Sequence, residues 1–425
     1  MKKIIIIAPH FPPSNLTAVH RSRLFAKYLP CFGWEPVVIT VKEKFYEETL
    51  DLDLEKQLSP SLRIEKVNAF PVIKVGKFRL VGDIGLRSFF QILFRIFAIT
   101  KKEKIDFIYI PIPPFYTALL GRLVHYFRKI RFGIDYIDPW VHEFPGSKTM
   151  FSRAWFSRAL AKILEPFAIR KASLITGVAA SYYQGTISRN NNLDKTCKFA
   201  AMPYGVDITA KLFEKETATI KPLFLVQKNK FQLIYAGALL PKSVEILEMV
   251  LKIISQNEDV FSRLEIHLIG TGQTTNDPEG YNIKPMAEKY GLWNKIIFEY
   301  PERIAHSRVL ANLASADGVF ILGSTQPHYT PSKVWEAMLV RKPVFAILNT
   351  HSAAVSAIKE ARAGVVVELD NQPDWDGLEK EFVKAWQEFQ SFVKNFKPEQ
   401  IDKRVLNTFS AKSITKILAE SLNSL

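Results

Sequence analysis

Residues 329–338, with the sequence YTPSKVWEAM, combine groups that suit a nucleotide diphosphate. Thr330 can cap a helix, and Pro331 suits the first helical position, where no N–H group is needed. The free backbone N–H groups of a helix start and the ammonium group of Lys333 both favour a phosphate. This pattern predicts a phosphate site at the beginning of a helix.

A carboxylate follows one helical turn later. Ser332 and Glu336 are four residues apart, so they share one face of the expected helix. A carboxylate does not favour phosphate, but it can accept hydrogen bonds from the diol of a sugar. The segment therefore predicts a nucleotide diphosphate pocket. The alternative is an ordinary capped helix in which Glu336 interacts favourably with the helix dipole.

The rest of the chain predicts elements that would position this segment. Apolar runs rich in Val, Ile, Leu and Phe alternate with helical stretches, which indicates parallel sheets covered on both faces. Two series of such runs predict an α/β protein with two doubly wound Rossmann-like domains. The runs are 2–8, 36–41, 106–111, 132–138, 173–179 and 198–204, then 231–237, 264–270, 295–300, 318–324, 343–348 and 363–369.

We expect an N-terminal domain over 1–207, a linker over 208–230, a C-terminal domain over 231–405 and a last helical segment, 406–425, that packs back on the first domain. Ligands of open α/β sheets bind beyond the carboxyl ends of the strands, so the cleft between two such domains is the expected site. The loops that follow the strands hold the candidate residues. These are His10, Ser14, Asn15, Arg21 and Asp138 in the first domain, and Gly237, Lys242, Gly270, Thr271 and Gly272 in the second.

This set of loops resembles the GT-B glycosyltransferases, in particular the large retaining group called family 4. The resemblance covers nearly the whole chain. It is carried by the first loop 9–14, the Pro-Tyr-Gly-Val-Asp motif 203–207, the donor loop 237–242, the Gly-x-Gly turn 270–272 and the paired-acid motif 328–336. The resemblance implies the GT-B fold, a nucleotide-sugar donor bound by the second domain, and a retaining transfer.

The chain departs from the family pattern at several positions. His328 stands where the family has the first acid of its pair, and Glu336 keeps the position that binds ribose. Ala238 replaces an arginine of the donor loop, and Ile137 replaces an arginine before Asp138. The glycine pair of the first loop is absent, and Ser14-Asn15-Leu16-Thr17 stands there instead.

The expected chemistry is breakage of the bond between the anomeric carbon and phosphate, so positive charge near the departing diphosphate is needed. Lys242 and Lys333 are the candidates, although each could be a solvated surface lysine. His328 could contact the transferred sugar or be a surface histidine. Asp138 could orient or deprotonate the acceptor hydroxyl, or cap the turn before Pro139. We expect no metal: the Asp-x-Asp at Asp51 reads, with its acidic neighbours, as a solvated face.

Composition adds a strong asymmetry of charge. Residues 1–207 contain 31 Lys and Arg against 17 Asp and Glu, whereas the remainder contains 26 against 25. A basic domain can bind nucleic acid, acidic substrates or anionic lipid. No nucleic-acid recognition motif accompanies the charge, which ranks nucleic acid below a membrane. Two cysteines give no disulfide framework and fit a reducing, cytoplasmic compartment.

The stretch 84–99 predicts a helix that is apolar around most of its circumference. Arg87 and Arg95 interrupt it, so an interfacial helix is favoured over a spanning one, with Phe90 and Phe94 in the lipid and the arginines at anionic headgroups. The alternative is a helix buried between a sheet and its neighbours, with snorkelling arginines.

Together these features predict a cytoplasmic glycosyltransferase at the inner face of the cell membrane. The donor would be a nucleotide-diphosphate sugar without a metal, and the acceptor a sugar or lipid-linked glycan, as in bacterial surface polysaccharide synthesis. The alternatives are a nucleotide-sugar epimerase or phosphorylase-type enzyme, and a sugar-nucleotide-binding protein without catalysis.

Overall fold

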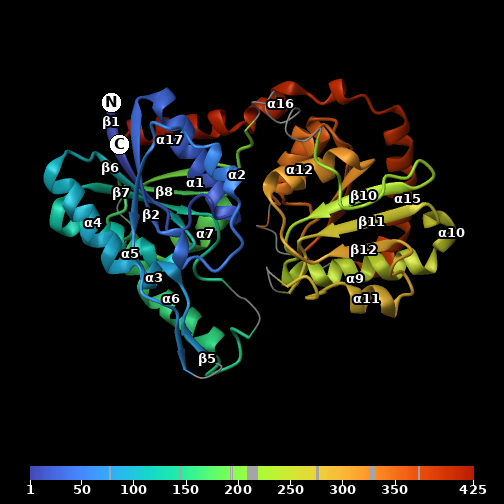
Figure 1. Cartoon of the computed structure of the whole chain (residues 1–425), viewed down its shortest axis with the longest axis horizontal. Helices are drawn as coiled ribbons and strands as arrows, with labels where there is room; N and C mark the ends of the chain where they lie inside the picture. Colours follow the sequence, from blue (N-terminus) through green and yellow to red (C-terminus); the bar gives the residue numbers. More distant parts are fainter. Residues whose placement is uncertain are drawn as a thin grey trace. The chain divides into compact units, whose positions relative to one another are not determined.

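The computed structural model describes residues 1–425 except 76–77, 143–145, 192, 194, 208–218, 274–276, 326–328, 330 and 372–373; for 73–75, 78–80, 241 and 376 it describes the backbone only. The chain divides into two compact units (Figure 1). Unit 1 contains Met1–Gly205 and Ala411–Leu425, and unit 2 contains Val206–Ser410.

The chain leaves unit 1 after Gly205 and returns to it at Ala411. The expected boundaries were 207 and 405. Of the expected linker 208–230, residues 208–218 lie outside the described residues, and the remainder belongs to unit 2.

Unit 1 is built on a parallel sheet with the strand order β3-β2-β1-β6-β7-β8-β9 in the described part of the chain. Alternate side chains of the central strands point to opposite faces, so Ile5 and Ile7 enter one core and Ile4 and Ile6 the other. The strands are β1 (Lys2–Ile7), β2 (Trp34–Val41), β3 (Arg63–Val67), β6 (Phe107–Ile112), β7 (Arg131–Tyr136), β8 (Leu174–Gly177) and β9 (Lys198–Ala201).

Helices cover both faces of this sheet (Figure 1). Helices α4, α5 and α6 pack on one face, and α1 and α17 pack on the other. The described helices are α1 (Thr17–Tyr28), α2 (Leu52–Lys56), α3 (Ile84–Arg87), α4 (Phe89–Lys102), α5 (Ala118–Arg128), α6 (Arg153–Ile169), α7 (Ala180–Arg189) and α17 (Ala411–Asn423). Ile414 and Leu418 of α17 lie in the same core as Phe25 and Leu29.

Three strands of unit 1 were missing from the prediction. β3 reads Arg-Ile-Glu-Lys-Val, so its charged residues hide the apolar signal, as expected for a strand at the edge of a sheet. β4 (Ile73–Val75) and β5 (Phe78–Val81) form a separate antiparallel pair.

Unit 2 contains a parallel sheet with the order β12-β11-β10-β13-β14-β15 in its described residues, all six strands being predicted. The strands are β10 (Phe231–Ala236), β11 (Leu264–Ile269), β12 (Ile297–Tyr300), β13 (Gly318–Leu322), β14 (Val344–Asn349) and β15 (Gly364–Leu369). The helices are α9 (Pro241–Gln256), α10 (Glu258–Phe261), α11 (Lys284–Lys289), α12 (His306–Ser315), α13 (Lys333–Leu339), α14 (Ala353–Glu360), α15 (Trp375–Asn395) and α16 (Lys403–Thr408).

Each sheet has a point at which the strand order reverses. In unit 1 the first strand, β1, lies between β2 and β6, and in unit 2 the first strand, β10, lies between β11 and β13. Loops that leave the carboxyl ends of such neighbouring strands diverge and leave room for a ligand. No helix among the described residues is long and apolar enough to cross a membrane.

Candidate functional site

The reversal point of unit 2 brings together the loops after β10 and β13. The N–H group of Gly237, just after β10, donates to the Ile269 carbonyl at the end of β11 over 2.7 Å. The hydroxyl of Ser243, in the first turn of α9, donates to the Gly323 carbonyl just after β13 over 2.5 Å. These bonds hold the starts of three loops at one edge of the sheet.

Lys333 lies directly against Gly237. A Cβ atom at Gly237 would come 2.7 Å from Cε and 3.2 Å from Nζ of Lys333. Gly237 also has a φ of +114°, which favours glycine. The Lys333 ammonium lies 4.8 Å from the centroid of the Tyr235 ring, a buried residue of β10. Two segments that the sequence separately proposed for donor binding are therefore in contact at the reversal point.

The helix after β13 begins later than predicted. α13 starts at Lys333 with Ser332 in the N-cap position, and no side-chain capping bond is formed there. The N–H groups of Val334 and Trp335 bond to the carbonyls of Pro331 and Ser332, the tighter pattern that often opens a helix. Thr330, the predicted cap, lies outside the described residues. Because α13 has only 7 residues, its dipole adds little positive charge at the helix start. The positive charge there comes mainly from the Lys333 ammonium group.

Glu336 lies in the first turn of α13 and is accessible. Its side chain is 25% exposed, and its Oε1 lies 3.8 Å from Nδ1 of His306, the first residue of α12. Ser332 and Lys333 are also half-buried. The carboxylate, the ammonium and the hydroxyl thus remain open to a ligand on one short helix. His306 was not predicted, because no motif marks a lone histidine at a helix start.

The Gly270–Gly272 turn follows β11 as predicted, but Thr271 has a structural role. Gly270 has a φ of +72°, and a Cβ atom at Gly272 would lie 2.7 Å from the Pro301 carbonyl oxygen. The Thr271 side chain is buried and donates to Oε1 of Glu299 over 2.9 Å. The Thr271 hydroxyl is therefore already used inside the protein, and the assignment of Thr271 to the donor-binding turn stays a prediction.

Glu299 organises this part of the site and was not predicted. Its buried carboxyl group in β12 also accepts hydrogen bonds from three successive backbone N–H groups at the start of α11, those of Asn282, Ile283 and Lys284. The sequence signal for this role was a carboxylate inside the apolar run Ile297–Tyr300. A carboxylate is buried in a strand only when other groups donate hydrogen bonds to it.

The predicted donor loop 237–242 continues beyond Gly237 to the start of α9. Lys242 is exposed in the first turn of α9, and the Ala238 carbonyl accepts a hydrogen bond from the Tyr235 hydroxyl over 3.0 Å. His328 lies outside the described residues.

In unit 1, the loop after β1 contacts a buried carboxylate, that of Glu48 from the segment after β2, which the sequence did not reveal. Oε1 of Glu48 lies 2.7 Å from Nδ1 of His10 and also accepts the Ser14 hydroxyl. These hydrogen bonds and the charge of His10 outweigh desolvation and lower the pKa of Glu48 to about 2. The expectation that the acidic stretch around Glu48 is a solvated face is wrong for this residue.

Arg21 is a structural residue and not a ligand-binding one. Its guanidinium is buried and forms a bidentate ion pair with Asp135 of β7, over 2.5 and 2.9 Å. It also donates to the carbonyls of Met202 and Pro203. The placement of Arg21 among the candidate ligand-binding residues of the first domain is therefore wrong, since its guanidinium is used inside unit 1. Asn15, a third predicted residue of the loop after β1, has a buried Oδ1 atom without a hydrogen-bond partner among the described residues.

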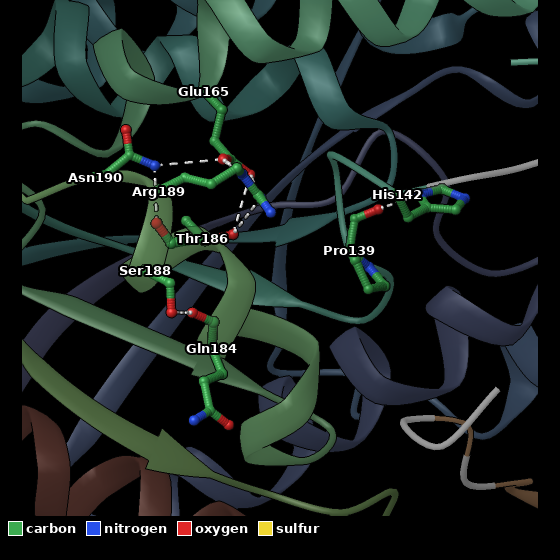
Figure 2. Close-up of polar contacts among 8 residues, drawn as sticks. All are labelled: Pro139, His142, Glu165, Gln184, Thr186, Ser188, Arg189 and Asn190. Carbon is green, nitrogen blue, oxygen red and sulfur yellow. Dashed lines mark hydrogen bonds and ion pairs between the residues drawn. The ribbon is translucent and has the colours of Figure 1, made fainter. Parts of the chain in front are cut away.

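Asp138 follows β7, at the carboxyl edge of the unit 1 sheet. The residue is exposed, yet desolvation by the surrounding protein raises its pKa to about 6. A carboxyl group can keep contact with water and still lose part of its hydration when protein atoms crowd around it. Behind it, Trp140 is buried and stacks on Phe115, and Nδ1 of His142 lies 2.6 Å from the Pro139 carbonyl oxygen (Figure 2).

The Asp-x-Asp pattern is also more structured than predicted. Asp51 is buried and caps α2 by accepting the N–H group of Asp53 over 3.1 Å, whereas Asp53 is exposed. Within the described residues, no group of three or more His, Cys, Asp or Glu side chains could hold a metal ion.

The predicted membrane helix 84–99 is broken. Ser88 donates its hydroxyl to the Ile84 carbonyl, ending α3, and α4 begins at Phe89. Arg87 is buried and donates to the backbone carbonyls of Phe45 and Phe70, so its assignment to lipid headgroups is wrong. The other residues assigned to the membrane are accessible. Phe90 and Phe94 are exposed, and Arg95 pairs with Glu65 over 2.5 Å.

No protein-family model matches the sequence, and a comparison with curated proteins also finds no match. Solved structures match the fold. HepE of Anabaena in complex with UDP is 16% identical with a TM-score of 0.62, covering 100% of both chains. WaaG, a glycosyltransferase involved in lipopolysaccharide biosynthesis, is 11% identical with a TM-score of 0.62, covering 99% of this chain and 100% of WaaG. Sucrose-phosphate synthase from Thermosynechococcus elongatus is 13% identical with a TM-score of 0.60, covering 100% of this chain and 95% of the synthase.

These matches extend over both units, and identities of this size establish the fold alone. Two Rossmann-like units with parallel sheets are present as predicted, and each sheet has its reversal point at the first strand. The chain therefore has the GT-B fold.

Proposed function

We propose that this protein is a glycosyltransferase that moves a sugar from a nucleotide-diphosphate donor to an acceptor. The observation that carries the proposal is the contact of Lys333 with Gly237 at the reversal point of unit 2, with Glu336 one helical turn away. Nucleotides bind at such points in doubly wound sheets. The fold, shared with UDP-bound HepE and with WaaG, agrees with this assignment.

The roles follow from the charges. The Lys333 ammonium would lie next to the diphosphate, where negative charge grows as the bond to the anomeric carbon breaks. Glu336 would accept the two ribose hydroxyls, since an accessible carboxylate suits a diol better than a phosphate. Lys242, exposed in the first turn of α9, would add a second cation from a neighbouring loop. Transfer without a metal ion is part of the proposal, with lysines supplying the positive charge.

Unit 1 would supply the acceptor site. Asp138, whose pKa is raised to about 6, could take the proton of an acceptor hydroxyl near neutral pH. His10 is a second base there, because Glu48 can hold its Nδ1–H and leave the lone pair on Nε2. The retaining outcome rests on the family resemblance alone. Proton NMR of the product tests it through the coupling constant of the new anomeric centre.

We further propose that the acceptor is a sugar on a lipid carrier, and that the protein works at the cytoplasmic face of the membrane in the synthesis of surface glycans. The basic character of unit 1 and the exposed aromatic residues Phe90 and Phe94 support this part of the proposal.

Binding of UDP, GDP and ADP by calorimetry tests the donor site. We expect one of them to bind the wild type, and Glu336→Ala to weaken its binding by about 10- to 100-fold, the effect of losing hydrogen bonds to a charged group. Glu360→Ala, at an exposed position at the end of α14, is the control and should bind like the wild type.

Absence of binding by all three nucleotides would refute the donor site. The reaction is tested separately by product analysis with and without acceptor extracts. Change of the donor sugar without any acceptor would instead identify an epimerase, and nucleotide binding with no turnover a non-catalytic binding protein.

A further inference from the structure

Helix α6 has an apolar face toward the core and a second one toward the solvent. Ala161, Ala168 and Ile169 are buried in the unit 1 core. On the other side, four large apolar side chains are exposed by between 42% and 71% of their surface. We call these four residues the α6 stripe: Phe156, Leu160, Ile163 and Phe167.

The spacing of the stripe places it on one line of the helix. Positions 156, 160, 163 and 167 follow the i, i+4, i+7, i+11 pattern, which marks one face at 3.6 residues per turn. That pattern usually identifies the buried face of a helix. Here the face it selects is the exposed one, and it points away from Ala161 and Ala168.

The orientation of α6 is secured from inside. Glu165, whose side chain is 1% exposed, accepts the Arg189 guanidinium over 2.9 Å and the Thr186 hydroxyl over 3.0 Å, both from α7 (Figure 2). Asn190 also donates to this carboxylate. Rotating α6 so that the stripe faces the core would separate the Glu165 carboxylate from Arg189 and Thr186. The loss of this buried ion pair would be costly, so the pair keeps the stripe exposed.

The charges around the stripe have one sign. Glu165 is the only acid of α6, and it is buried, whereas Arg153, Lys162 and Arg170 are exposed on or next to the helix. Unit 1 as a whole contains 33 Lys and Arg against 17 Asp and Glu. The outer surface of α6 is therefore apolar and cationic, with no exposed acid on the helix.

Helices α4 and α5 lie on the same face of the sheet as α6 (Figure 1). Their exposed side chains continue this character. Phe90 and Phe94 of α4 and Tyr126 and Phe127 of α5 are each more than half exposed. The Phe97 and Phe127 rings lie 5.9 Å apart and join the two helices, and Arg128 lies over Phe97.

We propose that the α6 stripe docks unit 1 on an anionic lipid bilayer. The exposed apolar side chains of the stripe can enter the acyl-chain region, and the cations around them can contact anionic headgroups. The inference deepens the proposed function, on which it rests for the lipid-linked acceptor. It moves the membrane contact from the predicted Arg87 to the exposed face of α6.

Vesicle sedimentation of the full chain tests the proposal without any donor or acceptor. We expect binding to phosphatidylglycerol vesicles, at least tenfold weaker binding to phosphatidylcholine vesicles, and loss of binding in high salt. Replacing Phe156, Ile163 and Phe167 by serine should weaken binding at least tenfold, since each removes several CH₂-equivalents from the lipid. Leu225→Ser with Val226→Ser, at exposed apolar positions of unit 2, is the matched control.

A second measurement locates the contact directly. Ile163→Trp should show fluorescence quenched by brominated lipids beyond the wild-type level, and Leu225→Trp should not. Equal vesicle binding by the serine variant and the wild type would overturn the proposal. So would a stripe-dependent dimer, seen by sedimentation velocity, that binds no vesicles. Vesicle binding without glycosyl transfer would instead refute only the proposed function.

Discussion

Lys333 is held at the point where two loops of unit 2 meet, against Gly237 and over the Tyr235 ring. If it neutralises a diphosphate, Lys333→Ala should weaken binding of a nucleoside diphosphate by about 10- to 100-fold and leave binding of the nucleoside nearly unchanged. Calorimetric titration with uridine and UDP checks this difference. Lys359→Ala, which removes an exposed lysine paired with Glu368, is the control. An equal loss for both ligands would contradict a phosphate role.

A second prediction for a single residue concerns Glu48 and the stability of the protein in acid. Its pKa is lowered from 4.5 to about 2 in the folded protein, so its contribution is complete above pH 4.5 and disappears as the pH falls toward 2. That contribution is at most about 3 kcal/mol for this shift.

Glu48→Gln should therefore lower the free energy of unfolding at pH 7 and narrow the difference between pH 7 and pH 3, as measured by urea denaturation. Glu420→Gln, at an exposed position of α17, should unfold like the wild type at both values. A Glu48→Gln protein that loses as much stability between pH 7 and pH 3 as the wild type would contradict the buried ionised state.

At the scale of elements, the turn after β10 depends on the missing side chain of Gly237. A Cβ atom there would lie 2.7 Å from Cε of Lys333, and the alanine backbone would have to adopt a φ of +114°. Gly237→Ala should therefore displace Lys333 and weaken nucleoside diphosphate binding by at least about tenfold, with a loss of about 1–3 kcal/mol in stability. Gly33→Ala is a useful control, since its φ is +83° but no atom lies within 4 Å of the new Cβ. Equal nucleotide binding by both variants would show that the contact is irrelevant to the ligand.

The elements that the sequence missed share a physical cause. β3 contains three charged residues among five because it lies at a sheet edge, and Ser88 ends α3 within the 84–99 stretch, with a side-chain bond to the backbone of the preceding turn. Both depend on what surrounds the segment. The central strands, buried on both faces, were visible as continuous apolar runs, because burial on both sides leaves no polar position.

At the scale of the whole molecule, two compact units with separate cores should respond separately to a ligand. If unit 2 alone holds the nucleotide, a concentration of one hundred times Kd adds about 2.7 kcal/mol to the stability of that unit. Scanning calorimetry should then show two transitions, of which the nucleotide raises only one. A single transition that shifts as a whole would show that the units unfold together.

The sequence by itself determined the two parallel sheets and the unequal charge of the two halves, and it selected Lys333 and Glu336 as candidates, because these follow from periodicity, composition and motif order. Only the tertiary structure decided the roles of buried polar groups. Arg21 pairs with Asp135, Thr271 with Glu299 and His10 with Glu48, and each partner is distant in the sequence. A buried polar or charged group needs a partner, and only the fold decides which residue provides it. The exposure of the α6 stripe was also decided by the tertiary structure. Periodicity identifies an apolar face of a helix but does not say whether the core covers that face.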